Sequence, residues 1–290
     1  MKSGNKIVIV LIIILIPLSS MCQNSSKGGN TAAALIEQII KNTGAPVLPK
    51  TVDVIKEGKP ETKVTGIVTT MFGTMEVLKT AVEKKCNLVI VHEPLYYNHL
   101  DDTKSYQNDP VFIEKQKYIK DNGLVIWRFH DYIHMMKPDG ISTGMIDKLG
   151  WKNYQVEGPS DKFRIPETSL EDLIRELKNK FPGSSFQVIG KPDLKVRGVA
   201  FDGGAPGSMT HIRDLQDPGT DVVIAGESPE WETYEYARDA VSQGRNKAVI
   251  FIGHINSEEA GMDYCAKWLK GFIKDIPITF VESGPSFRTY

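Results

Sequence analysis

Three apolar segments of the chain each end in a histidine. LVIV leads into His92, LVIWRF into His130, and AVIFIG into His254. In sheets of parallel strands, ligands gather outside the carboxyl ends of the strands. Three buried strands that each release a histidine at this end therefore predict one common site. The alternative for each single histidine is a structural, hydrogen-bonded role.

Other donors accompany these three histidines. Glu93 and Asp131 directly follow the first two, and Glu258 comes four residues after the third. His134 lies one helical turn beyond the second histidine, and Glu227 leaves a fourth apolar segment, VVIAG. Imidazole nitrogens and carboxylate oxygens in one pocket suit a borderline divalent ion such as zinc, iron, manganese or nickel. The pattern therefore predicts a metal site in a cleft.

Aromatic side chains stand beside the same strand ends. Tyr96 and Tyr97 follow the first histidine closely, and Trp127 belongs to the segment before the second. They either line a substrate pocket or pack around the strand ends, and the sequence leaves both interpretations open. His99 and His211 follow no apolar segment, and we expect them in exposed loops without a role in the site.

Alternating helices and strands must position these residues. Strand and helix patterns follow one another along most of the chain, which predicts an α/β fold with largely parallel sheets covered by helices. The glycine-rich segment 201–208, FDGGAPGS, lacks the spacing of a phosphate-binding loop and predicts a tight turn. The predicted helices cover residues 31–44, 74–86, 109–123, 142–150, 169–183, 228–244 and 257–275; the predicted strands cover 63–70, 87–92, 123–130, 186–190, 195–201, 221–226, 247–254 and 277–283.

One irregular stretch interrupts the alternation. Residues 151–168 have no helical period and indicate irregular or edge structure. This stretch is the best candidate for a seam between two similar lobes. We expect a first lobe over residues 31–150 and a second over residues 151–290, with interleaving of the two left open.

The first 22 residues have the features of an export leader. Two lysines precede an apolar run over residues 7–17, and small and polar residues follow. A membrane-spanning helix needs about 20 apolar residues, so this run is too short to span. Cys22 stands where bacterial lipoproteins carry their lipid, and a plain secretory leader is the alternative. Residues 23–30 are predicted to be a polar tether. From the leader we expect the protein in the periplasm or on a membrane as a lipoprotein.

Charge and cysteine content exclude other classes. Without the leader, 33 basic residues stand against 36 acidic residues and no basic block exists. A nucleic-acid partner is therefore not expected. Cys86 and Cys265 remain, which is too few for a zinc knuckle or a disulfide framework. Both are predicted to be buried thiols, with one bridge between them as the alternative.

Several segments resemble one known family in the same order along the chain. VTTMFGTMEVLKTAVEKKCNLVIVHEPLYY, residues 68–97, is similar to the type 2 GTP cyclohydrolase I family, also called the Nif-three-like dinuclear metal-centre family. The similarity continues through KDNGLVIWRFHDYIHMMKPDGISTGMIDKLG, FDGGAPGS, DVVIAGES and IFIGHINSEEAG. It covers about residues 31–287.

The resemblance implies five metal ligands. The family's first histidine corresponds to His92, its second to Glu93, and its aspartate to His134. Its last histidine and glutamate correspond to His254 and Glu258. Two positions therefore depart from the family pattern, yet the set of three histidines and two carboxylates is unchanged. We interpret the exchange as a variant site that still holds metal.

The resemblance further implies two α/β lobes, a pair of ions in the cleft between them, and a ring-like homo-oligomer, possibly a hexamer. Glu258 would bridge the two ions, and with His254 it is the expected catalytic group. His130 and Asp131 are expected behind the ligands or as additional ligands, and Glu227 is a further cleft candidate.

A metal-dependent hydrolase acting on a small molecule is the function that these residues favour. GTP ring opening, which the family name suggests, fits poorly with an exported chain that meets little GTP. A non-catalytic metal-binding or regulatory protein is the alternative, and a scaffold without metal is a third.

Overall fold

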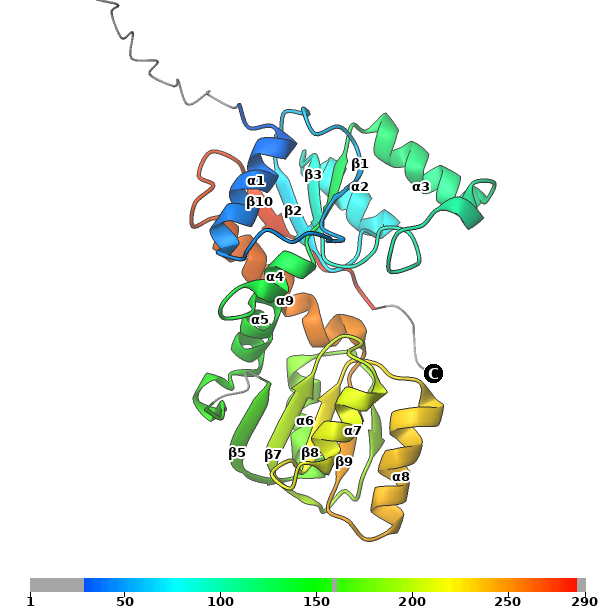
Figure 1. Ribbon diagram of the computed structural model, residues 1–290, viewed down its shortest axis with the longest axis vertical. Helices are drawn as coiled ribbons and strands as arrows, with labels where there is room; N and C mark the ends of the chain where they lie inside the picture. Colours follow the sequence, from blue (N-terminus) through cyan, green and yellow to red (C-terminus); the bar gives the residue numbers. More distant parts are fainter. Residues whose placement is uncertain (1–28, 158–160, 286–290) are drawn as a thin grey trace, which may run out of the picture.

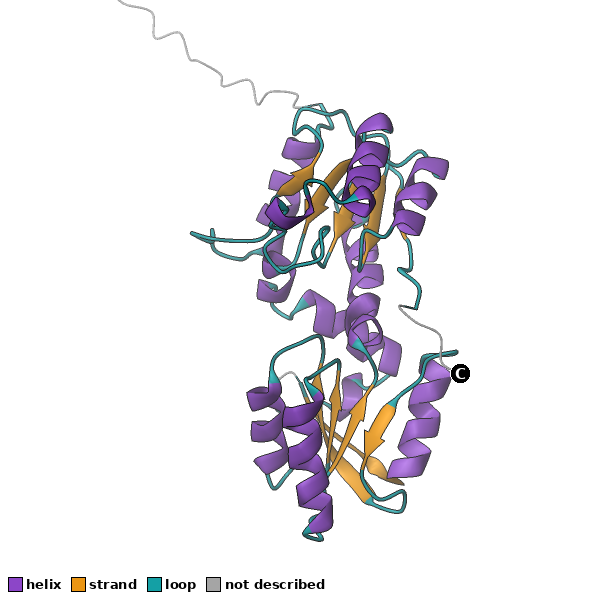
Figure 2. Cartoon of the chain, turned by 90° about the vertical axis from the view of Figure 1, so that its right-hand side faces the viewer, coloured by secondary structure: helices purple, strands orange, loops and turns teal. Residues whose placement is uncertain are grey.

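The protein consists of two α/β lobes, each built on a five-stranded sheet. The computed structural model describes residues 29–157 and 161–285. Figure 1 shows the lobes one above the other, with helices between them. Figure 2 shows helices on both faces of each sheet. The predicted α/β class is therefore confirmed. The helices between the lobes are α4 (Asp131–Met135), α5 (Gly140–Leu149) and α9 (His254–Leu269).

The N-terminal segment is outside the described residues. This concerns the predicted leader over residues 1–22, the candidate lipid-attachment residue Cys22, and all but the last two residues of the tether 23–30. Among the described residues, no helix has the length and apolar character needed to cross a bilayer.

The first lobe has a sheet with strand order β1-β4-β3-β2-β10. All neighbours are parallel except β1, which pairs antiparallel with β4 at the edge. The three central strands are fully buried because helices cover both faces, which is typical of parallel sheets. The strands are β1 (Ile55–Glu57), β2 (Ile67–Thr70), β3 (Leu88–Val91), β4 (Val125–Arg128) and β10 (Ile278–Phe280); the helices are α1 (Ala32–Thr43), α2 (Met75–Glu83) and α3 (Pro110–Asp121).

The second lobe has a sheet with strand order β5-β7-β8-β9-β6. The inner three strands are parallel, and both edge strands run antiparallel to their neighbours. The stretch predicted to be irregular or edge structure contains the edge strand β5. The strands are β5 (Lys162–Ser169), β6 (Gln187–Ile189), β7 (Lys195–Asp202), β8 (Val222–Ala225) and β9 (Ala248–Phe251); the helices are α6 (Leu170–Lys180), α7 (Ser208–Gln216) and α8 (Glu235–Ser242). Short helical turns cover Lys104–Tyr106, Lys152–Tyr154 and Glu230–Tyr234.

The chain returns to the first lobe at its end. Strand β10 pairs with β2, and the second half of α9 packs in the core of the first lobe through Met262, Cys265 and Leu269. Strands β1–β4 lie before residue 150 and β5–β9 after it, while β10 belongs to the first sheet. The lobes are interleaved, which the sequence had left open.

Helix α9 starts earlier than the sequence pattern suggested. The apolar stripe predicted a helix from residue 257, but the helix begins at His254, directly after Gly253. Gly253 has a φ of 90°, a backbone conformation that favours glycine, and so allows the strand to turn sharply into the helix. As a result, His254 and Glu258 lie one turn apart on the same helix face.

Helices α5 and α9 cross in direct backbone contact. A methyl group on Gly144 would lie 2.3 Å from the carbonyl oxygen of Ala260, and one on Gly261 would lie 2.5 Å from Cα of Ile141. Only glycine allows this approach. The contact fixes α9, which carries part of the candidate site, against α5, which follows α4.

We expect Gly144→Ala to destabilise the protein by about 1–3 kcal/mol, because the added methyl group forces the two backbones apart. Urea-induced unfolding would measure the loss. Gly29→Ala is the matched control, since a methyl group there meets nothing within 4 Å. Equal stability of the two variants would contradict the role assigned to the helix crossing.

Candidate metal centre

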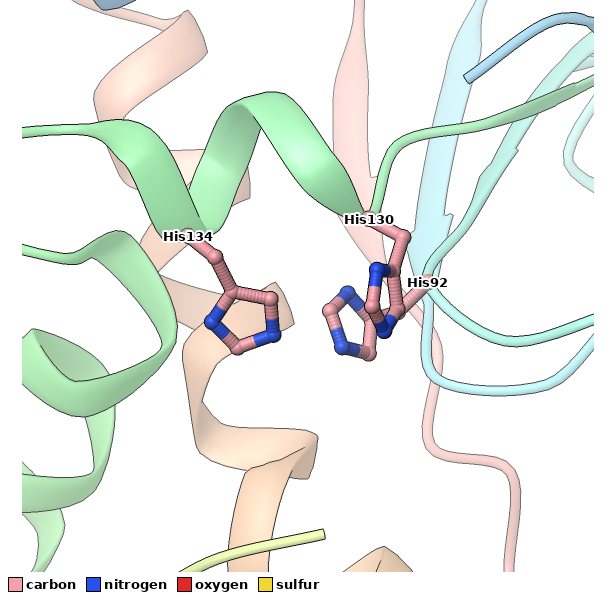
Figure 3. Close-up of side chains that lie close together, drawn as sticks. All are labelled: His92, His130 and His134. Atoms are coloured by element: carbon pink, nitrogen blue, oxygen red, sulfur yellow. The ribbon is translucent and has the colours of Figure 1, made fainter. Parts of the chain in front are cut away.

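Six donor side chains from three parts of the chain meet between the lobes. Figure 3 shows three of their imidazole rings. The rings of His130, just before α4, and His134, within α4, are turned toward the ring of His92, which follows β3. The donors are His92 and Glu93 directly after β3, His130 just before α4, His134 within α4, and His254 and Glu258 at the start of α9.

The imidazole of His92 is held in one orientation. Its Nδ1 lies 3.2 Å from the carbonyl oxygen of Phe129, and a carbonyl only accepts, so Nδ1 carries the hydrogen. Its Nε2 is buried and has no hydrogen-bond partner. Burial, and then the neighbouring His134 and His130, hold the pKa of His92 well below its usual value. A neutral ring with an unpaired, inward lone pair is the state that binds a metal ion, so the residues present fit such an ion.

The other three histidines share this arrangement, with a carboxylate as the acceptor at Nδ1. Such pairing of a histidine with an outer carboxylate orients ligand rings in metal sites and leaves Nε2 as the donor atom. The pairs are His130 with Asp131 at 3.0 Å, His134 with Asp139 at 2.9 Å, and His254 with Glu227 at 3.2 Å.

Two groups of donors could each hold a metal ion. His92, His130 and His134 form one group, and His92, Glu93 and Glu258 form the other; within each group the donor atoms lie within 4.8 Å of one another. The rings of His92 and His130 stack with centroids 4.7 Å apart. His130 therefore stands among the donors, while Asp131 lies behind it. Because His92 belongs to both groups, the two positions adjoin.

His254 connects the carboxylates of the site. Its Nε2 lies 3.1 Å from Oε1 of Glu93 and 3.0 Å from Oε2 of Glu258. Burial lowers the pKa of His254, but the hydrogen bonds to Glu227, Glu258 and Glu93 outweigh it and raise the pKa to about 12. Without metal this ring is therefore an imidazolium that neutralises part of the acidic charge, and a cation would take over that role.

Arg128 lies under the site and is completely buried. Its Nε donates to the backbone carbonyl of His92 at 3.1 Å, and Nη1 donates to that of His99. Its Nη2 lies 3.4 Å from Oε2 of Glu93. Burial raises the pKa of Glu93, but His254, then His130 and then Arg128 lower it overall. The guanidinium therefore fixes Glu93 as a carboxylate with Oε1 directed into the site.

Asp53 positions the first turn of α4. Its carboxylate accepts the backbone N–H groups of His130, Asp131 and Tyr132 at 2.8–2.9 Å. Asp131 in turn accepts from Thr51 in the same loop. Sequence reasoning missed Asp53, because it lies more than 70 residues away in an irregular segment and no local pattern marks it. Asp139 was also missed, although an aspartate directly before a helix start is a recognisable cap.

The glycine-rich turn supports the site from the second lobe. A methyl group on Gly204 would lie 2.5 Å from Oε1 of Glu258. The backbone N–H of Gly204 also donates to Oγ of Ser257 at 2.9 Å. Segment 201–208 therefore packs its backbone against the α9 carboxylate, in keeping with the tight turn predicted for it.

The aromatic residues proposed for a substrate pocket have different environments. Trp127 is fully buried in the core of the first lobe, and its Nε1 donates to the carbonyl of Asp53. Tyr96 is buried and donates to Glu57 at 2.9 Å. Both side chains therefore pack in the hydrophobic cores beside the strands. This is the second of the two interpretations that the sequence had left open, and it replaces the substrate pocket for these two residues. Only Tyr97 of the three has an exposed ring.

Two expectations for the remaining polar residues have different outcomes. His99 is exposed, but His211 is not a loop residue: it is buried within α7, with Nδ1 3.2 Å from Oγ1 of Thr233. The short apolar stripe of α7 was overlooked, so its inward face was not predicted. Cys86 and Cys265 are buried free thiols, as expected.

We expect His92→Ala to lower the amount of bound divalent metal by at least about tenfold at equal free-metal concentration, since this ring belongs to both donor groups. Elemental analysis after dialysis would measure it. His99→Ala removes an exposed imidazole and should leave the metal content unchanged. Equal metal content in both variants would show that the buried Nε2 is not a ligand.

Arg128→Met should reduce the free energy of unfolding by about 3–5 kcal/mol, because it removes one of the two cations beside the buried Glu93 carboxylate and the donor to the carbonyls of His92 and His99. Arg175→Met is the control, since Arg175 forms only exposed ion pairs on α6 and should change stability by about 0.5 kcal/mol or less. Urea unfolding of both variants tests this, and equal losses would refute the structural role of Arg128.

Comparisons with known proteins agree with this architecture. Two curated relatives are each named GTP cyclohydrolase 1 type 2 homolog. The one from Clostridium acetobutylicum is 25% identical over 232 residues, covering 76% of this chain and 82% of the relative. The one from Clostridium perfringens is 23% identical over 211 residues, covering 69% and 76%.

Solved structures share the fold. A Bacillus cereus protein related to NIF3 matches with a TM-score of 0.72 at 15% identity, covering 90% of this chain and all of that one. A hypothetical protein of Staphylococcus aureus matches with a TM-score of 0.68 at 17% identity and the same coverage. The family model for Duf34/NIF3 (NGG1p interacting factor 3) matches residues 51–285. The chain therefore belongs to the Duf34/NIF3 family, the Nif-three-like family that its motifs resemble.

Proposed function

We propose that the protein is a metal-dependent hydrolase that acts on a small molecule at a dinuclear centre between the lobes. One observation carries the proposal: four imidazoles have their Nδ1 atoms held by acceptors of the protein, and their rings converge with two carboxylates. A structural histidine needs no such convergence. A site that must hold cations in fixed positions does.

Two ions of the zinc, iron, manganese or nickel class suit this mixture of nitrogen and oxygen donors. The ligands that the family resemblance implies are His92, Glu93, His134, His254 and Glu258. We add His130, because it forms a group of close donor atoms with His92 and His134. A bound pair of ions would supply an activated water and polarise the bond under attack.

The chain's own groups handle protons in this proposal. Glu227 keeps a hydrogen on Nδ1 of His254, so Nε2 is the atom that exchanges a proton or donates its lone pair. Oε2 of Glu258 lies 3.0 Å from that Nε2 and 3.7 Å from Nε2 of His92. Glu258 is therefore placed to accept a proton from a reacting group bound between the lobes.

The compartment in which the protein works limits which substrates it can meet. The leader supports export, to the periplasm or to a membrane through a lipid on Cys22, where GTP is scarce. We therefore propose another small hydrolysable compound, contacted by the exposed ring of Tyr97. Assembly into a homo-oligomer, as the family resemblance implies, belongs to the same proposal.

The test compares protein loaded with each candidate metal against nucleotides, phosphoesters and cyclic amides. We expect Glu258→Gln and His254→Ala to lower turnover by about 10²–10⁴-fold, because each removes a proton-handling group. His99→Ala is the control and should retain full turnover. Metal content is measured in the same samples. Full metal content without turnover on any substrate class would instead support a metal-binding or regulatory protein.

A further inference from the structure

A second group of acidic residues lies in the second lobe and shares no member with the metal centre. It consists of Asp161, Asp202 and Asp214, and one carboxylate oxygen from each lies within 4.8 Å of the others. Asp161 directly precedes β5, Asp202 ends β7, and Asp214 is on the inward face of α7. Three separate elements therefore bring carboxylates to one point.

Asp202 is the residue that makes this group more than an acidic surface. It is only 4% exposed, and its Oδ2 is buried without any hydrogen-bond partner. An unpaired carboxylate oxygen in such a place is costly, and native proteins satisfy it with a hydrogen bond, a cation or a proton. Burial, and then the charges of Asp214 and Asp161, raise the pKa of Asp202 to about 7.

The positively charged side chains near Asp202 form ion pairs with carboxylates other than that of Asp202. Lys162 pairs with Asp214, with its Nζ 3.2 Å from Oδ1, and also with Asp217. Arg213 lies 3.4 Å from Oδ2 of Asp214. Within the described ranges, neither cation is within ion-pair distance of Asp202. The negative charge at Asp202 is therefore not neutralised by a direct partner.

The three oxygens lie close enough together to contact one ion, and their chemistry favours a hard cation. Calcium binds oxygens at 2.3–2.6 Å, so oxygens on opposite sides of one ion lie about 5 Å apart. Carboxylates without imidazole or thiolate ligands favour calcium or magnesium over zinc. Calcium tolerates irregular ligand arrangements better than magnesium does.

We propose that Asp161, Asp202 and Asp214 form a second, oxygen-only cation site that prefers Ca²⁺. The site would join the edge of the second sheet to α7, and it includes none of the histidines of the metal centre. It takes a different class of ion from the metal centre, so the two sites can be filled independently. This inference does not depend on the hydrolase activity.

Calorimetric titration of the zinc-loaded, mature protein with Ca²⁺ at pH 7.5 tests the proposal. We expect one Ca²⁺ per chain, weaker binding of Mg²⁺, and a Tm that rises with the logarithm of the Ca²⁺ concentration above Kd. Asp202→Asn should weaken Ca²⁺ binding by about tenfold or more. Asp193→Asn removes an exposed carboxylate elsewhere in this lobe and should bind Ca²⁺ as the unchanged protein does.

A second variant keeps the test valid if Asp202→Asn fails to fold. Lys162→Met removes the ammonium that competes for Asp214, so it should bind Ca²⁺ more tightly than the unchanged protein. Absence of Ca²⁺ binding in the unchanged protein would overturn the proposal, and so would equal binding by Asp202→Asn. Either result would mean that the Asp202 carboxyl group carries a proton instead of binding a cation. The Asp202→Asn variant should then be as stable as the unchanged protein, with or without Ca²⁺.

Discussion

The orientation of four imidazole rings is the constraint on which the rest of the structure depends. Each ring gives its Nδ1 hydrogen to a fixed acceptor, and only one of these acceptors is a backbone carbonyl. The other three are carboxylates, which must themselves be held. Asp131 begins α4 and accepts from Thr51, while Asp139 and Glu227 stand in the loops before α5 and after β8. The fold can therefore be understood as a support for acceptors behind the ligands.

Electrostatics explains how so many acids coexist in one place. Glu93 and Glu258 are both buried, and each lies beside the imidazolium of His254. Arg128 adds a second positive charge under Glu93, from inside the sheet. Removal of these cations would leave buried carboxylates facing one another, which proteins avoid. Glu93, which the resemblance sets at the position of the family's second histidine, has this buried arginine beside it.

The sequence was sufficient to predict that these histidines and carboxylates meet in one place, but not which residues hold them there. Apolar strands that end in His92, His130 and His254 are visible in the periodicity, and parallel-sheet geometry then brings such strand ends together. Asp53 and Arg128 could not be found in this way, because they act through contacts distant in the chain. Trp127 shows the same limit: its neighbours in sequence lie near the site, while its own ring is buried in the core of the first lobe. The return of β10 to the first sheet is likewise set by tertiary packing.

Helix α9 has a mechanical consequence that follows from its two halves. Its beginning touches the glycine-rich turn of the second lobe, and its end is embedded in the core of the first. Sixteen residues make a rod about 24 Å long, held at mid-length where Gly261 packs against the backbone of α5. Such a strut resists hinge bending, so the two halves of the molecule cannot swing apart as independent bodies. Entry to the space between them must then depend on the movement of surface loops.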